Sequence, residues 1–150
     1  MTETLRIEPA TIAVILPLRT EVLRDGQPAE SAQFLGDDDP TTLHLAAISD
    51  AKGCDAVVGC VTLMAMPMPE DPTWTHQLRG MAVADGFRNQ GIGGRLLTAL
   101  RDHAPDLKIW CNARVPAQRF YERHGWTAVG KPFEIKHHGP HIRMTRRLSA

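Results

Sequence analysis

A change of hydrophobic period within residues 74–112 constrains the fold of this 150-residue chain more than any other feature. The segment WTHQLRGMAVA, at Trp74–Ala84, is typical of a long strand. After a glycine-rich turn, four apolar residues recur at helical spacing: Ile92, Leu96, Leu97 and Leu100. Pro105 ends that helix, and LKIWCN at residues 107–112 indicates a buried strand. Strand, helix and strand in this order predict a right-handed parallel crossover, and therefore an α/β fold.

The first half of the chain predicts a helix and a hairpin. The apolar spacing of Thr11–Leu23 predicts one kinked helix or two short ones, because Pro17 lacks an amide hydrogen. Residues 25–40 are rich in Gly, Pro and Asp and predict a loop. Leu43–Ser49 and Ala56–Met66 flank a turn, which predicts an antiparallel hairpin.

The last forty residues predict one more helix and short strands. Pro116 suits the first turn of that helix, and Gly125 suits its left-handed C-terminal cap. Strands are expected at three places: residues 127–129, 133–136 and 142–148. A parallel crossover beside an antiparallel hairpin gives a mixed central sheet flanked by helices (α/β, α+β). The length matches one domain over residues 1–150.

Charge and composition exclude several classes of protein. Lys plus Arg equals Asp plus Glu at 17 each, so no overall field favours nucleic acid or an anionic membrane. The longest apolar stretch, Ala56–Met68, is shorter than the roughly 20 residues of a spanning helix. Cys54, Cys60 and Cys111 form no CxxC pair, and we interpret them as buried small hydrophobes. We expect a cytoplasmic protein with no nucleic-acid or membrane partner.

The turn DGFRNQGIGGRLL, which opens at Asp85, is a candidate phosphate cradle. Its glycines let the backbone approach a ligand, and the amides at a helix N-terminus carry partial positive charge. The Rossmann fingerprint needs a third glycine where Leu96 stands, and the P-loop needs Gly-Lys-Ser/Thr where Gly93, Gly94 and Arg95 stand. Neither nucleotide motif fits, so the turn holds an anion in another way or only allows tight packing.

Two spaced motifs resemble those of the GCN5-related N-acetyltransferase (GNAT) superfamily. RNQGIG, at Arg88–Gly93, is similar to its Q/R-x-x-G-x-G/A signature. NARVPAQRFYERHGW, at Asn112–Trp126, is similar to its later motif of asparagine, alanine, Phe-Tyr and Gly-aromatic. The order of the expected elements agrees over nearly the whole chain. Three further segments resemble the ElaA-type subgroup: LRTEVLRDGQP, FLGDDDPTTLHLAA and HHGPHIRM.

The resemblance implies an N-acetyltransferase that moves an acetyl group from acetyl-coenzyme A to a primary amine of a small molecule or peptide. The transfer would be a direct attack in a ternary complex. The backbone of Met81, Ala82 and Val83 would pair with the pantetheine arm, and Asn112 would bond that arm. The pyrophosphate would rest on the amides of the turn: Arg88, Asn89, Gln90, Gly91, Ile92, Gly93 and Gly94.

Proton transfer needs further side chains. Tyr121, the only tyrosine, matches the family position that donates to the departing thiolate, with an aromatic core role as the alternative. An amine of pKa near 10.4 is only about 0.04% neutral at pH 7, so a base or a water chain must take its proton. The candidate bases are His76, Glu134 and His141. Each is otherwise a solvated or structurally bonded side chain, and the choice stays open.

The residues also leave open a second functional class and the roles of two polar segments. A non-catalytic acyl-coenzyme A sensor would keep the cradle, although Tyr121 favours the enzyme because a sensor needs no donor at the thiol. The acidic run Asp37–Asp39 either attracts a cationic amine or is a solvated loop. His137, His138 and His141 lack a fourth ligand at metal-site spacing, so no metal is expected. The acceptor, the acyl chain and a possible homodimer are not settled by the residues.

Overall fold

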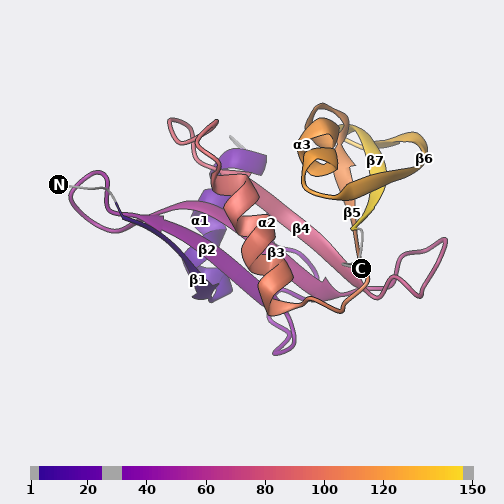
Figure 1. Ribbon diagram of the computed structural model, residues 1–150, viewed down its shortest axis with the longest axis horizontal. Coiled ribbons are helices and arrows are strands. Elements are labelled where there is room, and N and C mark those ends of the chain that lie inside the picture. The colour runs from indigo at the N-terminus through magenta and orange to yellow at the C-terminus, as the bar shows by residue number, and fades with distance from the viewer. Residues whose placement is uncertain (1–3, 25–31, 147–150) are drawn as a thin grey trace. The chain divides into compact units, whose positions relative to one another are not determined.

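The computed structural model describes residues 4–24 and 32–146, shown as a ribbon in Figure 1. Its strands are β1 (Leu5–Ala10), β2 (Leu43–Ser49), β3 (Ala56–Ala65), β4 (His76–Val83), β5 (Ile109–Arg114), β6 (Trp126–Ile135) and β7 (Gly139–Arg146). Its helices are α1 (Ile12–Leu23), α2 (Ile92–His103), the 3₁₀ helix η2 (Val115–Ala117) and α3 (Gln118–Arg123). The strands are hydrogen-bonded in the order β1-β2-β3-β4-β5-β7-β6, which confirms the predicted mixed sheet.

The chain divides into two compact units. The first comprises Met1–Met64 and Gly80–His103, and the second comprises Ala65–Arg79 and Ala104–Ala150. The start of β4 therefore belongs to the second unit and its end to the first. Each unit carries its own group of the predicted site residues.

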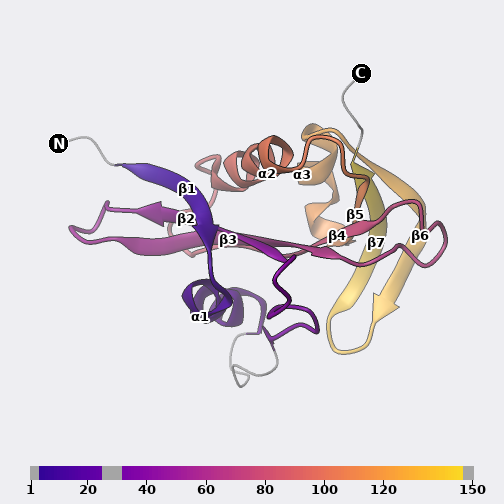
Figure 2. The ribbon, with the colours of Figure 1, turned by 90° about the horizontal axis from the view of Figure 1, so that it is seen from below.

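In the first unit, helices cover both faces of an antiparallel sheet. β2 pairs antiparallel with β3, which confirms the predicted hairpin, and β1 pairs antiparallel with β2. Figure 2 shows α1 on one face of these strands and α2 on the other. The residue patterns did not predict β1, because its side chains are mostly half-buried and show no clear alternation.

The two helices of this unit follow their apolar spacing. All four residues predicted for the inner face of α2 are buried: Ile92, Leu96, Leu97 and Leu100. α1 is one helix with Pro17 inside it, so the alternative of two short helices is wrong. Pro17 is exposed, and water can therefore reach the carbonyl whose amide partner the proline removes. Of the predicted loop at residues 25–40, residues 32–40 contain turns and no strand, and 25–31 lie outside the described residues.

In the second unit, β7 lies between β5 and β6 and is antiparallel to both. The start of β4 pairs in parallel with β5 over His76–Leu78, which confirms the parallel crossover. α3 packs on β5 and β6, as Figure 1 also shows. Gly125 follows α3 with a φ of +89°, as predicted for the left-handed cap.

The two short strands expected near the C-terminus are one strand, β6. Its register with β7 shifts between Val129 and Phe133, which is the break that the sequence suggested. Gly130 has a φ of +78°, and Pro132 has no amide to donate, so the ladder cannot continue there. β7 ends at Arg146, and residues 147–148 of the last predicted strand lie outside the described residues.

The cysteines divide between core and surface. Cys60 and Cys111 are buried and unpaired, as predicted. Cys54 is exposed, so the prediction that it is buried is wrong. It lies in the turn between β2 and β3.

Gly59 sets how closely α2 approaches β3. A Cβ at this position would lie 2.9 Å from Ile92 Cγ2, 3.1 Å from Leu96 Cδ1 and 3.2 Å from Ala47 Cβ. The absence of a side chain therefore lets the apolar face of α2 pack directly on the strand.

We predict that Gly59→Val lowers the free energy of unfolding by about 1 to 3 kcal/mol, because three core neighbours must move to accept the added atoms. Denaturant unfolding measures the change. Thr98→Ala, on the exposed face of α2, is the control and should change stability by less than about 0.5 kcal/mol. Wild-type stability in Gly59→Val would show that α2 docks more loosely than the structure indicates.

Candidate active site

The turn between β4 and α2 has the backbone of an anion cradle. Asn89 and Gly91 adopt left-handed φ angles of 62° and 80°, and Arg95 N donates to Gly91 O at 3.0 Å to open the helix. The amides of the first helical residues precede this bond and have no partner within the helix. A Cβ at Gly91 would meet nothing within 4 Å, so the backbone there faces open space. The turn therefore presents amides to a ligand.

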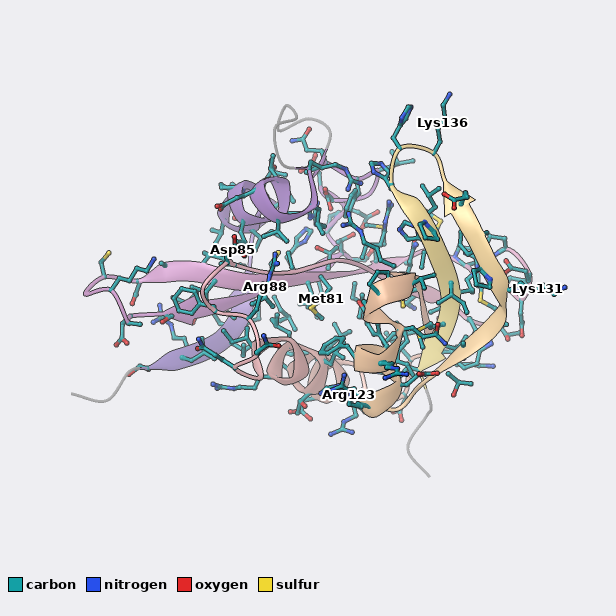
Figure 3. The ribbon with its side chains drawn as sticks, turned by 90° about the horizontal axis from the view of Figure 1, so that it is seen from above. Met81, Asp85, Arg88, Arg123, Lys131 and Lys136 are labelled. Carbon is teal, nitrogen blue, oxygen red and sulfur yellow. The ribbon has the colours of Figure 1, made fainter. Side chains whose placement is uncertain are left out.

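The side chains of the turn and of the first turn of α2 bond groups of the first unit. Arg88 Nε donates to Val83 O at 3.3 Å, and Arg88 Nη1 lies 3.6 Å from the carboxylate of Asp85. Figure 3 shows Asp85 and Arg88 on this turn at the end of β4. Gln90 Nε2 donates to Gly86 O at 3.1 Å, and Arg95 Nη2 donates to Leu5 O on β1 at 3.1 Å. The side chain of Arg88 is therefore held close to the backbone amides of the turn.

The end of β4 has free amides on one edge. Ala84 N donates to Val58 O at 2.8 Å, and the amide of Ala82 bonds Cys60, so both point toward β3. Because successive amides of a strand point to opposite edges, those of Met81 and Val83 point away from β3. This is the edge that the predicted pairing with the pantetheine arm requires.

In the second unit, Asn112 belongs to a polar cluster on one face of the sheet. It lies opposite Arg143, and the next pair along the two strands is Arg114 and His141. Arg143 donates to Asn112 Oδ1 through Nη1, and to Glu70 through Nε and Nη2 at 2.9 Å each. Its guanidinium also lies 4.9 Å from the Trp110 ring centroid. The side-chain oxygen of Asn112 is therefore occupied, while its NH₂ group stays available to an acceptor.

Tyr121 is the buried residue of α3, the helix that packs on the other face of β5. Its ring centroid is 5.1 Å from that of Phe120 and 5.5 Å from that of Trp126, both edge to face, and the residue is 6% exposed. Burial, with a smaller effect of Cys111, raises the pKa of Tyr121 well above 10. Its hydroxyl makes no hydrogen bond within residues 4–24 and 32–146 and is not sealed from solvent. The ring is fixed, and the donor is free for a ligand.

The three candidate bases lie in different surroundings. His141 is buried, and its Nδ1 lies 2.9 Å from Gly139 O. A carbonyl only accepts, so Nδ1 carries the hydrogen and Nε2 of the neutral ring is the basic nitrogen. Glu134 is exposed at the position opposite Pro140. His76 bonds Thr75 Oγ1 at 2.8 Å opposite Ile109, and burial lowers its pKa.

The structure therefore brings Asn112 and His141 together on one face but leaves Glu134 and His76 apart from them. Glu134 alternates with Phe133, the residue opposite His141, and so lies on the other face. His76 is level with Ile109, three residues before Asn112 along β5. No pattern in the sequence identified Glu70 and Arg143 as partners, because they are separated by 73 residues.

The acidic run Asp37–Asp39 divides between a buried residue and two exposed ones. Asp37 is 6% exposed and is paired with the fully buried Arg19 at 2.7 Å. Asp39 accepts from the amide and hydroxyl of Thr41. Asp37 is therefore structural, because its carboxylate completes a buried ion pair, whereas Asp38 and Asp39 are exposed, as predicted for a solvated loop.

Comparison with known proteins identifies the family. The sequence profile of the Acetyltransferase (GNAT) family matches residues 12–126, more than half of the chain. The chain belongs to the GNAT family. It is 29% identical over 147 residues to the "Uncharacterized N-acetyltransferase YitI" of Bacillus subtilis (strain 168), covering 95% of this chain and 97% of that protein.

Two solved structures show the same fold. Escherichia coli ElaA has a TM-score of 0.68 and 19% identity, over 97% of this chain and 100% of its own. An aminoglycoside 6'-N-acetyltransferase complexed with coenzyme A has a TM-score of 0.66 and 17% identity, over 94% and 96%. Family membership makes the protein an acyltransferase that uses acetyl-coenzyme A and acts on amines. At such identities, the ElaA-type subgroup stays a prediction.

Between residues 4–24 and 32–146, no three His, Cys, Asp or Glu side chains gather as metal ligands. None of the described helices has the length and apolarity that a membrane crossing requires. The candidate residues of the first unit are those of the turn and the edge of β4, and the candidate residues of the second unit are side chains on the two faces of its strands.

We predict that tyrosinate absorbance appears at a clearly higher pH in the folded enzyme than in the unfolded chain, which is about half ionised near pH 10. Tyr121 is the only tyrosine, so ultraviolet titration reports its hydroxyl alone, with Tyr121→Phe as the blank. The folded state keeps a proton that the unfolded chain loses near pH 10. Stability from this group is complete below pH 10 and falls as pH rises toward the higher folded pKa. Ionisation near pH 10 in the folded enzyme would contradict the burial of the ring.

Proposed function

We propose that residues 1–150 form one N-acetyltransferase domain that moves an acetyl group from acetyl-coenzyme A to a primary amine of a small molecule or peptide. The amine attacks directly while both substrates are bound. The observation that carries this proposal is Tyr121: its ring is fixed on two sides, and its hydroxyl is left without a protein partner among the described residues. A hydroxyl without a protein partner, on a fixed ring, can donate a hydrogen bond to the departing thiolate. An acyl-coenzyme A sensor would not need such a donor.

The first unit supplies the groups that bind the cosubstrate. The amides from Arg88 to Gly94 hold the pyrophosphate, supported by the left-handed Asn89 and Gly91 and by the open space beside them. The amides of Met81 and Val83 face away from β3, so they can pair with the pantetheine arm, and one of them can stabilise charge on the thioester oxygen. Ile92 takes part through its amide only, because its side chain is 3% exposed in the core.

The second unit supplies the groups that handle protons. His141 Nε2 takes a proton from the ammonium group, since its Nδ1–H is held by Gly139 O. The amine then forms a bond to the acetyl carbon, the bond from that carbon to sulfur breaks with its electron pair leaving on the thiolate, and the second proton of the amine nitrogen passes to solvent. Tyr121 donates a hydrogen bond to that thiolate, and its raised pKa favours keeping its own proton during the step.

Asn112 and the remaining candidates complete the assignment. The NH₂ group of Asn112 is directed by the bond from Arg143 to its oxygen, which supports donation to a carbonyl of the pantetheine arm. Glu134 and His76 are less well supported as bases, because neither shares a face with Asn112 and His141. We also propose a cytoplasmic location, which suits three free thiols and a cytosolic cosubstrate. A homodimer stays a prediction.

The function is tested by thiol release from acetyl-coenzyme A with a panel of amines: amino acids, polyamines, aminoglycosides and peptide N-termini. We expect at least one class to accelerate release, and Tyr121→Phe to lower kcat about 10²-fold with that amine while the cofactor Kd stays within about twofold. His141→Gln, which keeps a polar side chain of similar size, should lower kcat further than Glu134→Gln. Tight cofactor binding with no acceptor in the panel would favour the sensor instead.

We predict that Gly91→Asp weakens acetyl-coenzyme A binding about 5- to 150-fold, because it places a negative charge among the amides that face the pyrophosphate. Gly91→Asn is the matched control, since both residues tolerate a left-handed φ and differ only in charge. Titration calorimetry gives the Kd of each variant. Equal losses for the two variants would show that the backbone, and not the anion, requires glycine.

A further inference from the structure

A fully buried arginine organises the first unit around one polar network. Arg19, on α1, is 0% exposed and donates through Nη1 to Asp37 at 2.7 Å and to Ala32 O at 2.9 Å. Its Nη2 donates to Asp37 at 3.2 Å and to Thr62 Oγ1 on β3 at 2.6 Å. The guanidinium also stacks on the Phe34 ring, 4.1 Å from its centroid. One side chain thus joins α1, the loop at residues 32–37 and β3.

Each hydrogen bond of this network has a defined donor and a defined acceptor. His44 Nε2 lies 3.0 Å from Asp37 O, so that nitrogen carries a hydrogen and donates it. In the neutral ring, His44 Nδ1 is then an acceptor, and Thr62 Oγ1, at 2.7 Å, donates to it. The same hydroxyl oxygen accepts from Arg19. Thr62 is therefore the link between the arginine and the histidine, and an apolar side chain there would remove a bond from each of them.

The network reaches β4 at Gly80, where the backbone of the strand is irregular. Gly80 has a φ of +64°, in the interior of a strand, and its carbonyl accepts from Cys60 Sγ at 3.5 Å. A Cβ at Gly80 would lie 2.8 Å from Arg19 Nε and 3.2 Å from Phe34 Cε2. Arg19 Nε is buried and has no hydrogen-bond partner among the described residues. A buried N–H group without a hydrogen bond lowers the stability of a protein. The position of Arg19 Nε beside Gly80 therefore needs a structural explanation.

We propose that Arg19 is a positioning residue for acyl transfer: with Asp37, Thr62 and His44, it holds the bend of β4 at Gly80 and thereby aims the amides of Met81 and Val83. This rests on the proposed role of those amides toward the thioester. The bend directly precedes Met81, so a change at Gly80 rotates the amides that follow. The pyrophosphate turn lies beyond Val83 and makes no bond to the network in the described chain.

The proposed role affects the rate of acyl transfer more than the affinity for the cosubstrate. Charge develops on the thioester oxygen only as the amine attacks, so misaimed amides weaken the transition state more than the bound cosubstrate. The pyrophosphate contacts supply affinity and are left unchanged. A network that only stabilised the fold would lower the melting temperature and leave kcat of the folded enzyme as it is.

Thr62→Val tests this directly, because valine has the shape of threonine without the hydroxyl. We expect kcat to fall at least about tenfold while the Kd for acetyl-coenzyme A stays within about threefold, and Thr62→Ser to restore kcat. Ile48→Ala is the matched control: Ile48 lies in the apolar cluster with α1 and takes no part in the network. All assays are run where each variant is fully folded.

Amide hydrogen exchange of the free protein gives a readout that needs no amine. Peptides covering residues 78–84 should exchange faster in Thr62→Val than in Thr62→Ser or Ile48→Ala. Wild-type kcat in Thr62→Val, or a loss no larger than that of Ile48→Ala, would overturn the proposal, as would unchanged exchange at residues 78–84. If the wild-type enzyme turns over no amine, the proposed function fails, and exchange alone decides whether the network holds β4.

Discussion

A guanidinium that no water reaches must find all its partners in the protein, and Arg19 imposes this constraint on the first unit. Removing one member of such a buried pair costs about 3 to 5 kcal/mol, because the other charge is left unpaired. Asp37 and the carbonyl of Ala32 in the loop, with Thr62 on β3, supply partners for Nη1 and Nη2, and only Nε lacks one among the described residues. The loop at residues 32–37, the first helix and the central strands are therefore held by one group, and a loop rich in aspartate becomes ordered structure.

The second unit separates its chemistry by strand alternation. Asn112, Arg143 and His141 lie on one face of β5 and β7, and Cys111 with Tyr121 lies on the other. The first face is polar, and Arg143 holds the pKa of Glu70 below its usual range through their hydrogen bonds. The second is apolar and raises the pKa of both Cys111 and Tyr121 through burial. Strand alternation thus places the polar and the apolar groups of this unit on opposite faces of the same strands.

Sequence reasoning succeeded where a pattern is local. The helical spacing of Ile92 to Leu100 and the glycines before it predicted α2 and its turn, because both depend on neighbouring residues. It could not predict the pairs Arg19–Asp37 and Glu70–Arg143, because each joins distant segments whose charges look like ordinary surface residues in the sequence. Cys54 was assigned wrongly for a related reason: apolar neighbours in the chain do not cover a residue at the tip of a hairpin.

The surroundings of Tyr121 limit how it can act. The burial that fixes its ring also raises the pKa of its hydroxyl, so proton loss to a thiolate of pKa near 8.5 becomes more uphill than for a free phenol. The same burial strengthens a hydrogen bond to a charged acceptor, because the local dielectric is low. The hydroxyl is therefore better suited to stabilising the thiolate than to protonating it.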